Sequence, residues 1–319
     1  MTNRIQTYLS TLVFTIFLLI SSANAEVKVV TSIKPIHSLV SYIMDGVEKP
    51  NVIVDGYNSP HGFSLKPSHA KMLENADLVI WVGEDLETFL KKPLETIANK
   101  AKNIELIDLK GIKKLEFREK NIFEGHDEHK EKDDHKDHDE HKEKDDHEGH
   151  AHGEHDPHIW LDPINAKVII KEITKQLVQL DSKNSSIYKS NSKKALTEID
   201  KLVENITKDL NKDLRFVVFH DAYQYFENRF GIKVLGALTV NTDVMPGAEQ
   251  LSEIREAIEH EKVNCLFSEP QFNPSIIKSI VKDTNVKTGI LDPLGAELDK
   301  GKNLYFNLLK NMSSSFKGC

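Results

Sequence analysis

The chain has 319 residues, a formal net charge of −8 at pH 7 and hydrophobic side chains at 39% of its positions. This length and apolar content are enough for about two domains with buried cores. The negative balance and the lack of a basic patch argue against nucleic acid as a partner and are compatible with binding a cation.

Residues 1–25 have the pattern of a secretory signal peptide. Arg4 gives a positive start, an apolar run extends from Leu12 to Ile20, and Ala23-Asn24-Ala25 supplies the small residues of a cleavage site. The apolar run is shorter than the ~20 residues that cross a bilayer as a helix. We therefore expect cleavage before Glu26 and export; the alternative is an uncleaved membrane anchor.

In residues 26–183, short apolar runs alternate with helical patterns, as in a parallel sheet with crossover helices. The expected strands are Val27–Ile33, Asn51–Asp55, Leu78–Val82 and Ile104–Leu109. The expected helices are Pro35–Met44, Ser68–Asn75, with Ser68 as N-cap, and Leu86–Ala98. This region is predicted to form an N-terminal α/β lobe.

A polar insertion, residues 124–156, interrupts that lobe. The stretch from Asp127 to His135 recurs letter for letter at Asp139–His147, and no aliphatic side chain is larger than that of Ala151. Such a composition cannot bury enough apolar surface to offset the entropy of ordering, so the insertion is predicted to be disordered.

The insertion contains nine histidines among acidic residues, which suits weak auxiliary binding of zinc, copper or nickel. The alternatives are a solvated charge run or a cloning tag. The nine are His126, His129, His135, His138, His141, His147, His150, His152 and His155.

Residues 184–211 are predicted to form a long amphipathic helix that links two lobes. Apolar residues recur there at spacings of three and four, from Tyr188 to Leu210. One helical crossover is a stiff joint, so we expect small rocking of the lobes.

Residues 212–319 repeat the alternation and are predicted to form a C-terminal α/β lobe. The expected strands are Phe216–Phe219, Lys233–Leu238, Cys265–Ser268 and Val286–Leu291. The expected helices are Gly247–Glu259, Pro274–Lys282 and Leu304–Ser314.

The chain has two cysteines, Cys265 and Cys319. In an exported protein the economical interpretation is one disulfide. The alternatives are two free thiols or a thiolate metal ligand, although the pair lacks C-x-x-C spacing.

Three histidines and one aspartate outside the insertion lie where expected strands end. His61 follows the strand near Val52, His158 lies in an Asp-Pro-His-Ile-Trp stretch, His220 ends a strand, and Asp292 ends another. Open α/β sheets bind ligands at the carboxyl ends of their strands, so all four side chains are expected in the cleft between the lobes. Three imidazoles and one carboxylate suit four-coordinate zinc, whereas manganese prefers more oxygen ligands.

Five motifs in this order resemble the ZnuA type of zinc-specific solute-binding protein, from the cluster A-I (cluster 9) metal-binding components of ABC transporters. The resemblance covers residues 27–319 and implies two Rossmann-like (β/α) lobes, a long rigid backbone helix, a metal in the interlobe cleft and a His- and acid-rich loop. The motifs are Pro60-His61-Gly62-Phe63, His158-Ile159-Trp160-Leu161-Asp162-Pro163, Phe219-His220-Asp221-Ala222-Tyr223, Glu269-Pro270-Gln271-Phe272 and Leu291-Asp292-Pro293-Leu294-Gly295.

The resemblance places the family's three histidine ligands on His61, His158 and His220. The carboxylate ligand of manganese relatives falls on Asp292. Those relatives have a glutamate at the place of His220, so the imidazole favours zinc. Some members carry a glutamate before the first histidine, where this chain has Pro60, so the fourth ligand is left open between Asp292 and water.

Two further assignments complete the predicted site. Cys265 and Cys319 match the paired cysteines of zinc members of the family. Glu269 lies near the expected cleft, and we expect it behind the ligands, where it would orient a histidine by accepting its other ring proton.

The sequence therefore predicts a monomeric periplasmic protein that captures Zn²⁺ with high affinity and delivers it to an inner-membrane ABC permease with its ATPase. An enzyme is not expected, because the chain has no H-E-x-x-H, no G-x-S-x-G and no phosphate loop. The alternatives are a zinc-dependent hydrolase with a three-histidine site, a manganese- or iron-binding relative, and a surface-attachment role.

Overall fold

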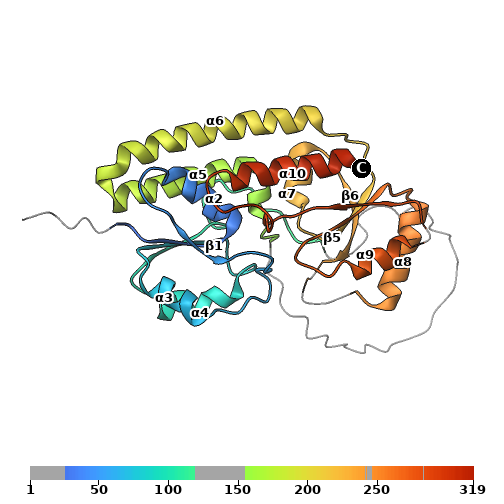
Figure 1. The fold of residues 1–319 in the computed structure, drawn as a ribbon, viewed down its shortest axis with the longest axis horizontal. Helices are drawn as coiled ribbons and strands as arrows, with labels where there is room; N and C mark the ends of the chain where they lie inside the picture. The colour runs from blue at the N-terminus through green and yellow to red at the C-terminus, as the bar shows by residue number, and fades with distance from the viewer. Residues whose placement is uncertain (1–25, 119–154, 241, 243–245, 283) are drawn as a thin grey trace, which may run out of the picture.

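The structure, a computed structural model, describes residues 26–118, 155–240, 242, 246–282 and 284–319 (Figure 1). The expected signal peptide and the insertion as far as residue 154 lie outside these residues. Within the described ranges, no helix is long and apolar enough to span a bilayer.

The N-terminal lobe is built on a four-stranded parallel sheet in the order β2-β1-β3-β4. Its central strands consist mainly of apolar and β-branched residues and are buried on both faces, as is typical of parallel sheets. The strands are β1 (Val29–Ile33), β2 (Asn51–Val54), β3 (Leu78–Trp81) and β4 (Lys102–Glu105).

Most elements of this lobe lie within one or two residues of the predicted bounds, and two of the differences have a clear physical reason. Strand β4 begins at Lys102, whereas Ile104–Leu109 was expected, because an edge strand exposes polar residues that do not read as a buried run. Helix α3 (Pro67–Glu74) has Lys66 as its N-cap, and Ser68 lies within the first turn. Proline favours the first helical position, which accounts for the earlier start. The other helices here are α2 (Lys34–Ile43) and α4 (Thr88–Thr96).

The C-terminal lobe repeats the plan with a parallel sheet in the order β6-β5-β7-β8. Its strands are β5 (Phe216–His220), β6 (Val234–Thr239), β7 (Cys265–Ser268) and β8 (Lys287–Ile290). Helices α8 (Ala248–His260) and α9 (Ser275–Val281) lie near the expected positions. The predicted α/β class with two parallel-sheet lobes is confirmed.

Two helices were not expected from the sequence. Helix α5 (Pro163–Leu180) begins where the Asp162 carboxylate accepts a hydrogen bond from the Ile164 N–H at 2.8 Å. Helix α7 (Gln224–Phe230) ends at Gly231, whose φ of +70° suits the left-handed C-terminal turn. Two short 3₁₀ turns, η1 (Ile159–Leu161) and η2 (Ser182–Asn184), flank α5.

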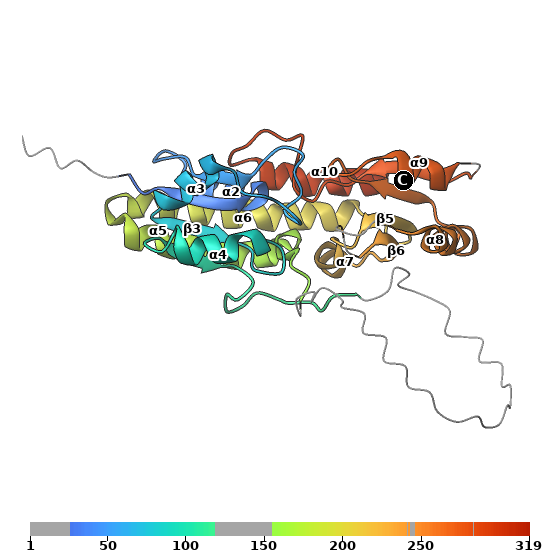
Figure 2. The same cartoon turned by 90° about the horizontal axis from the view of Figure 1, so that it is seen from below.

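Two helices link the lobes. Helix α6 (Ser185–Asp209) runs along one side of both lobes in Figure 1, and Figure 2 shows that it spans them lengthwise. Helix α10 (Leu304–Gly318) packs against α6 and α2. The continuous apolar core that includes β1, α5, α6, β5 and α10 therefore extends through both lobes. A disulfide between Cys265 and Cys319 fastens the end of α10 to β7, as predicted.

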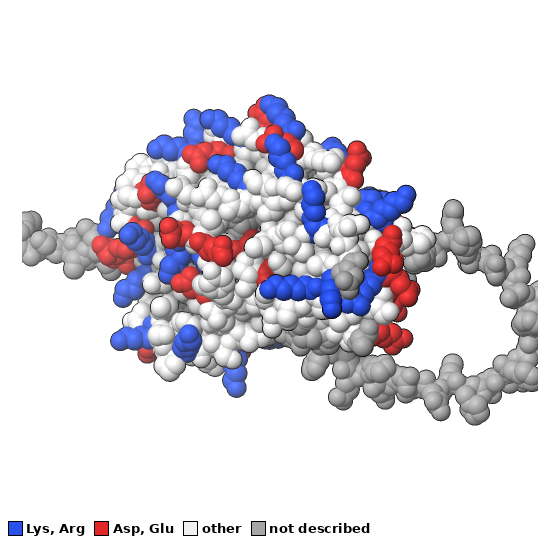
Figure 3. All heavy atoms as spheres, turned by 45° about the vertical axis from the view of Figure 1, so that its right-hand side comes forward, with Lys and Arg blue, Asp and Glu red and all other residues white. Residues whose placement is uncertain are grey.

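The charged surface shows no large area of one sign on the face in Figure 3, where Lys and Arg alternate with Asp and Glu. Lys34, in contrast, is buried. Its ammonium group donates to the carbonyl oxygens of Gly295, Ala296 and Leu298 at 2.6, 3.0 and 2.8 Å. This cation therefore ties α2 of the first lobe to the turn that follows β8.

Candidate metal centre

Three of the predicted ligands converge between the lobes. One ring nitrogen from each of His61, His158 and His220 lies within 4.8 Å of the other two. The Nε2 atoms of His158 and His220 are 3.3 Å apart. His61 and His158 come from the N-terminal lobe and His220 from the C-terminal lobe, so the cluster joins the two halves of the molecule.

His61 is held by a tight turn between β2 and α3. Its backbone N–H donates to the Ser59 Oγ at 3.2 Å, and Gly62 follows with a φ of +66°, a conformation that favours glycine. The next side chain, Phe63, packs against Phe89 with ring centroids 5.1 Å apart. The turn is thereby anchored on the lobe while the imidazole faces the other histidines.

His158 is fixed by Asp156. The Asp156 Oδ1 is 2.7 Å from the His158 Nδ1 and accepts the His158 backbone N–H at 2.9 Å. Both residues are buried. The sequence placed Asp156 at the end of the disordered insertion, and the structure corrects this, because Asp156 belongs to the folded lobe. The Asp-x-His spacing, in which a carboxylate accepts from the N–H two residues on, is the local pattern that marks it.

His220, the last residue of β5, is fixed by Glu269. The Glu269 Oε1 lies 2.6 Å from the His220 Nδ1 and also accepts the Tyr223 hydroxyl at 3.0 Å. Glu269 follows β7, which neighbours β5 in the sheet, so the topology brings acid and imidazole together. Glu269 thus lies behind a histidine, where the sequence prediction put it.

The buried charges give the histidines different protonation equilibria. Burial, with the charge of His220, lowers the pKa of His158 well below its usual value. Burial alone lowers the pKa of His220, but the Glu269 carboxylate and the charges of Asp221 and Asp156 raise it above its usual value. Burial raises the pKa of Asp156 to about 7, against the opposing effects of the His158 N–H and of Arg118.

This arrangement fits a four-coordinate cation. In their ionised forms the Asp156 and Glu269 carboxylates only accept hydrogen bonds. Each then takes an Nδ1 proton and leaves the Nε2 lone pairs of His158 and His220 facing each other. Zn–N distances of about 2.0–2.1 Å in a tetrahedron place two ligand nitrogens about 3.4 Å apart. The observed 3.3 Å separation agrees with that geometry.

Asp292, the fourth predicted ligand, does not join the three histidines. Its Oδ1 accepts from the backbone N–H groups of Leu294 and Gly295 at 3.1 and 2.9 Å, and its Oδ2 from that of Ala296 at 2.5 Å. The Gln271 amide donates to the same Oδ1 at 2.9 Å. The carboxylate is therefore engaged by the turn that follows β8.

Of the nine insertion histidines, only His155 lies in the described part of the chain. It forms an isolated antiparallel bridge with Glu116 and so belongs to the base of the insertion. The other eight lie outside the described residues.

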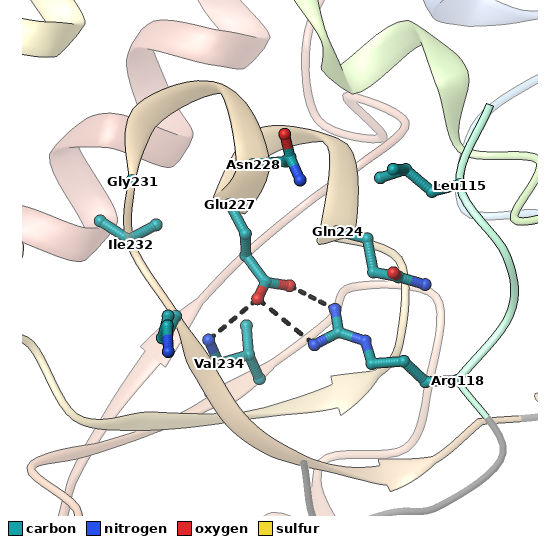
Figure 4. A pocket seen from close by; sticks show the side chains of 9 residues that line it. Leu115, Arg118, Gln224, Glu227, Asn228, Gly231, Ile232 and Val234 are labelled. Carbon is teal, nitrogen blue, oxygen red and sulfur yellow. Dashed lines mark hydrogen bonds and ion pairs between the residues drawn. The ribbon is translucent and has the colours of Figure 1, made fainter. Parts of the chain in front are cut away.

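A cavity of about 450 Å³ lies beside α7, and none of the three histidines lines it (Figure 4). Arg118, the last described residue before the insertion, donates from Nε to Asp221 at 2.9 Å and from Nη2 to Glu227 at 2.5 Å. Asp221 follows His220 directly in the chain. Sequence reasoning missed Arg118, because no local pattern marks a partner 103 residues away.

Comparisons with known proteins give a family match and several relatives. The family described as "Zinc-uptake complex component A periplasmic" (ZnuA) matches residues 29–319. The high-affinity zinc uptake system protein ZnuA of Brucella abortus (strain 2308) is 48% identical over 312 residues, which cover 94% of this chain and 93% of that protein. The protein of the same name from Haemophilus influenzae is 39% identical over 323 residues, covering 93% of each.

A solved structure, "Crystal structure of ZnuA", has the same fold. Its TM-score is 0.73 at 23% identity, and the match covers 92% of this chain and 98% of that chain.

Proposed function

The chain belongs to the ZnuA family of periplasmic zinc-uptake components, and we propose that it captures Zn²⁺ for uptake at the cluster of His61, His158 and His220. The observation that carries this assignment is the convergence of three ring nitrogens within 4.8 Å from both lobes. Zinc is here the transported ligand, so the protein needs a site that both binds the ion and releases it.

The surroundings of the histidines support a zinc site. His158 and His220 each place Nδ1 against a buried carboxylate, which fixes the ring and increases the basicity of the ligating nitrogen. Three imidazoles suit zinc better than manganese, which prefers carboxylate, carbonyl and water ligands.

Members of this family are the binding components of ABC transporters. The finer assignment is that this protein acts as a monomer in the periplasm and passes zinc to an inner-membrane permease driven by its ATPase. We expect residues 1–25 to be removed when the chain is exported. Mass spectrometry of the protein from the periplasmic fraction would test whether the mature chain begins at Glu26.

The rival function, a zinc hydrolase, needs room for an organic substrate beside the metal. The cavity lined by the three histidines has a volume of about 10 Å³, the room that one water molecule or one ion occupies. A cavity of this size favours a protein that carries an ion over an enzyme that binds an organic substrate. An ester-hydrolysis assay on the zinc-loaded protein separates the two, because a carrier gives no turnover.

The proposed capture site is tested by replacing His220 and measuring zinc affinity by competition with a chelator. We expect His220→Ala to abolish the tight site, since two imidazoles remain. The matched control is His260→Ala, which changes an exposed histidine at the end of α8. Equal affinity in His220→Ala and His260→Ala would refute the proposed site.

A further inference from the structure

The chain passes beside the zinc site where it returns from the C-terminal lobe to the N-terminal lobe. Residues 292–298, which follow β8 and precede α10, form what we call the closing turn. Two of them, Pro293 and Leu294, line the cavity of the three histidines. A cavity of about 10 Å³ has no room for the hydration shell of an ion. Part of its wall must therefore move before zinc can enter or leave.

The closing turn is held between two opposite charges. The Asp292 Oδ2 accepts the Ala296 N–H at 2.5 Å, and the Lys34 Nζ donates to the carbonyl oxygen of Gly295 at 2.6 Å. These two backbone groups belong to the same peptide unit, which is thus hydrogen-bonded at one end to a carboxylate and at the other to an ammonium group. Hydrogen bonds to ionised groups are stronger than those between neutral groups, so this unit is firmly fixed.

Lys34 provides the contact from the N-terminal lobe. It is the first residue of α2 and is 4% exposed. An ammonium group has three N–H donors, and the carbonyl oxygens of Gly295, Ala296 and Leu298 take all three. The start of the turn has a second tie to the same lobe, because the Trp160 Nε1 donates to the Pro293 carbonyl oxygen at 2.8 Å. Lys34 holds the rest of the turn.

We propose that Lys34 is a positioning residue for zinc exchange: it latches the closing turn to the N-terminal lobe, and release of this latch lets zinc enter and leave the cavity. This inference rests on the proposed capture of zinc by the three histidines. Neither Lys34 nor the three residues whose carbonyls it binds line the cavity. The latch therefore resists opening equally with and without the ion, so it sets the rates of exchange and leaves the affinity unchanged.

Stopped-flow measurement of zinc binding and release by the mature chain tests this role. Lys34→Met keeps a long unbranched side chain but donates no hydrogen bond. We expect it to raise both the association and the dissociation rate constant by about 10-fold, the effect of losing hydrogen bonds from a charged group. The dissociation constant from chelator competition should change by less than about 2-fold, because both rates rise together.

Two control variants separate the latch from other effects. Lys302→Met, the same change at an exposed lysine before α10, should leave both rates unchanged. Ile43→Val removes one methyl group from the buried face of α2, so it should lower the free energy of unfolding and also leave both rates unchanged. Rates that rise in Ile43→Val as much as in Lys34→Met would reduce the role of Lys34 to general stability and overturn the inference.

The rates in Lys34→Met also distinguish the latch from an effect on the bound ion. Unchanged rates would overturn the inference. Faster dissociation with unchanged association would overturn it as well, because Lys34 would then stabilise the zinc-bound form alone.

A second variant carries the test should Lys34→Met fail to fold. Gly295→Ala retains the lysine but strains the closing turn, because Gly295 has a φ of +70° and an added Cβ would lie 3.3 Å from the side chains of Leu298 and Leu304. Both rates should rise in this variant too, and unchanged rates would count against the latch.

Amide hydrogen exchange tests the latch without zinc. The N–H groups of Leu294, Gly295 and Ala296 are bonded to Asp292, and they should exchange faster in Lys34→Met and in Gly295→Ala than in the wild type. Unchanged exchange would reject the latch and leave the capture site intact. Absence of tight zinc binding by the wild type would instead reject the proposed function and leave the exchange result standing.

Discussion

His158 and His220 both offer an Nε2 lone pair to the metal, but their pKa values are shifted in opposite directions. His158 is buried next to another imidazole, which lowers its pKa, and it therefore stays neutral as the pH falls. The carboxylates near His220 raise its pKa despite burial. A proton competes with the metal mainly at His220.

Zinc affinity should therefore fall with decreasing pH, beginning above the usual histidine pKa of about 6.5. The sign follows from the raised pKa, because His220 binds a proton at a higher pH than a free imidazole and must lose it to bind zinc. Chelator competition between pH 8 and pH 5.5 measures the midpoint. Glu269→Gln should move that midpoint to lower pH; an affinity that does not change over this range would contradict the prediction.

Asp156 should matter for zinc although it does not touch the ion. Asp156→Asn keeps an oxygen for the two hydrogen bonds from His158 but removes the negative charge that increases the basicity of the ring. We expect zinc affinity to fall by about 10-fold, at the lower end of the effects seen for residues behind a ligand. Titration calorimetry of Asp156→Asn and of Asp213→Asn, an exposed control, tests this; equal affinities would argue against the role of the charge.

At this scale the sequence indicates the ligands better than the residues that support them. His61 lies in the turn after β2, His158 directly before η1 and His220 at the end of β5. Each stands in a recognisable local motif, so their convergence could be predicted. Arg118 acts on Asp221 across 103 positions of the chain, a contact that only the folded lobes create. Asp156 was hidden because its neighbours on the N-terminal side are polar and repetitive, and the repeat pattern masked the point where the fold resumes.

Among the elements, those with strong apolar periodicity were predictable and those defined by packing were not. Strand β7 has the predicted bounds, Cys265–Ser268, and α6 (Ser185–Asp209) lies within two residues of the predicted range 184–211. Helix α7 was missed because seven residues are too short for a helical period to stand out. Helix α10 extends beyond the predicted Ser314, since the disulfide and the packing of Phe316 hold its last turn.

The last turn of α10 therefore depends on the disulfide. Cys265 and Cys319 are 54 positions apart, and closing a loop of that size stabilises the fold by about 4 kcal/mol in the chain-entropy model. Cys319→Ser should lower the free energy of unfolding by about that amount, while Cys265 remains as a small buried thiol.

Urea unfolding with and without a reductant measures this contribution. Reductant should destabilise the wild type and leave Cys319→Ser unchanged. Equal stability of the reduced and oxidised wild type would show that packing alone holds α10.

At the scale of the whole molecule, the zinc site lies between two lobes that already pack closely against each other. The lobes share one apolar core, α6 and α10 both cross between them, and Lys34 binds three carbonyls of the opposite lobe. Within this framework the Nε2 atoms of His158 and His220 are 3.3 Å apart, and a ring nitrogen of His61 lies within 4.8 Å of both rings. We therefore expect the metal to need only small rearrangements of side chains or lobes; the stiff crossover expected from the sequence stays a prediction.

The insertion should add metal capacity to this framework without creating the tight site. Residues 124–154 carry 14 acidic and 5 basic side chains with eight histidines, so they attract cations and offer many weak ligands. The deletion must stop at residue 154, because His155 and Asp156 belong to the fold and Asp156 fixes His158. Native mass spectrometry during a zinc titration should show one tight ion with and without residues 124–154, and further weak ions only in the intact chain. Loss of the tight ion on deletion would mean that the insertion supplies a ligand, and the assignment of the capture site to the three histidines alone would then be wrong.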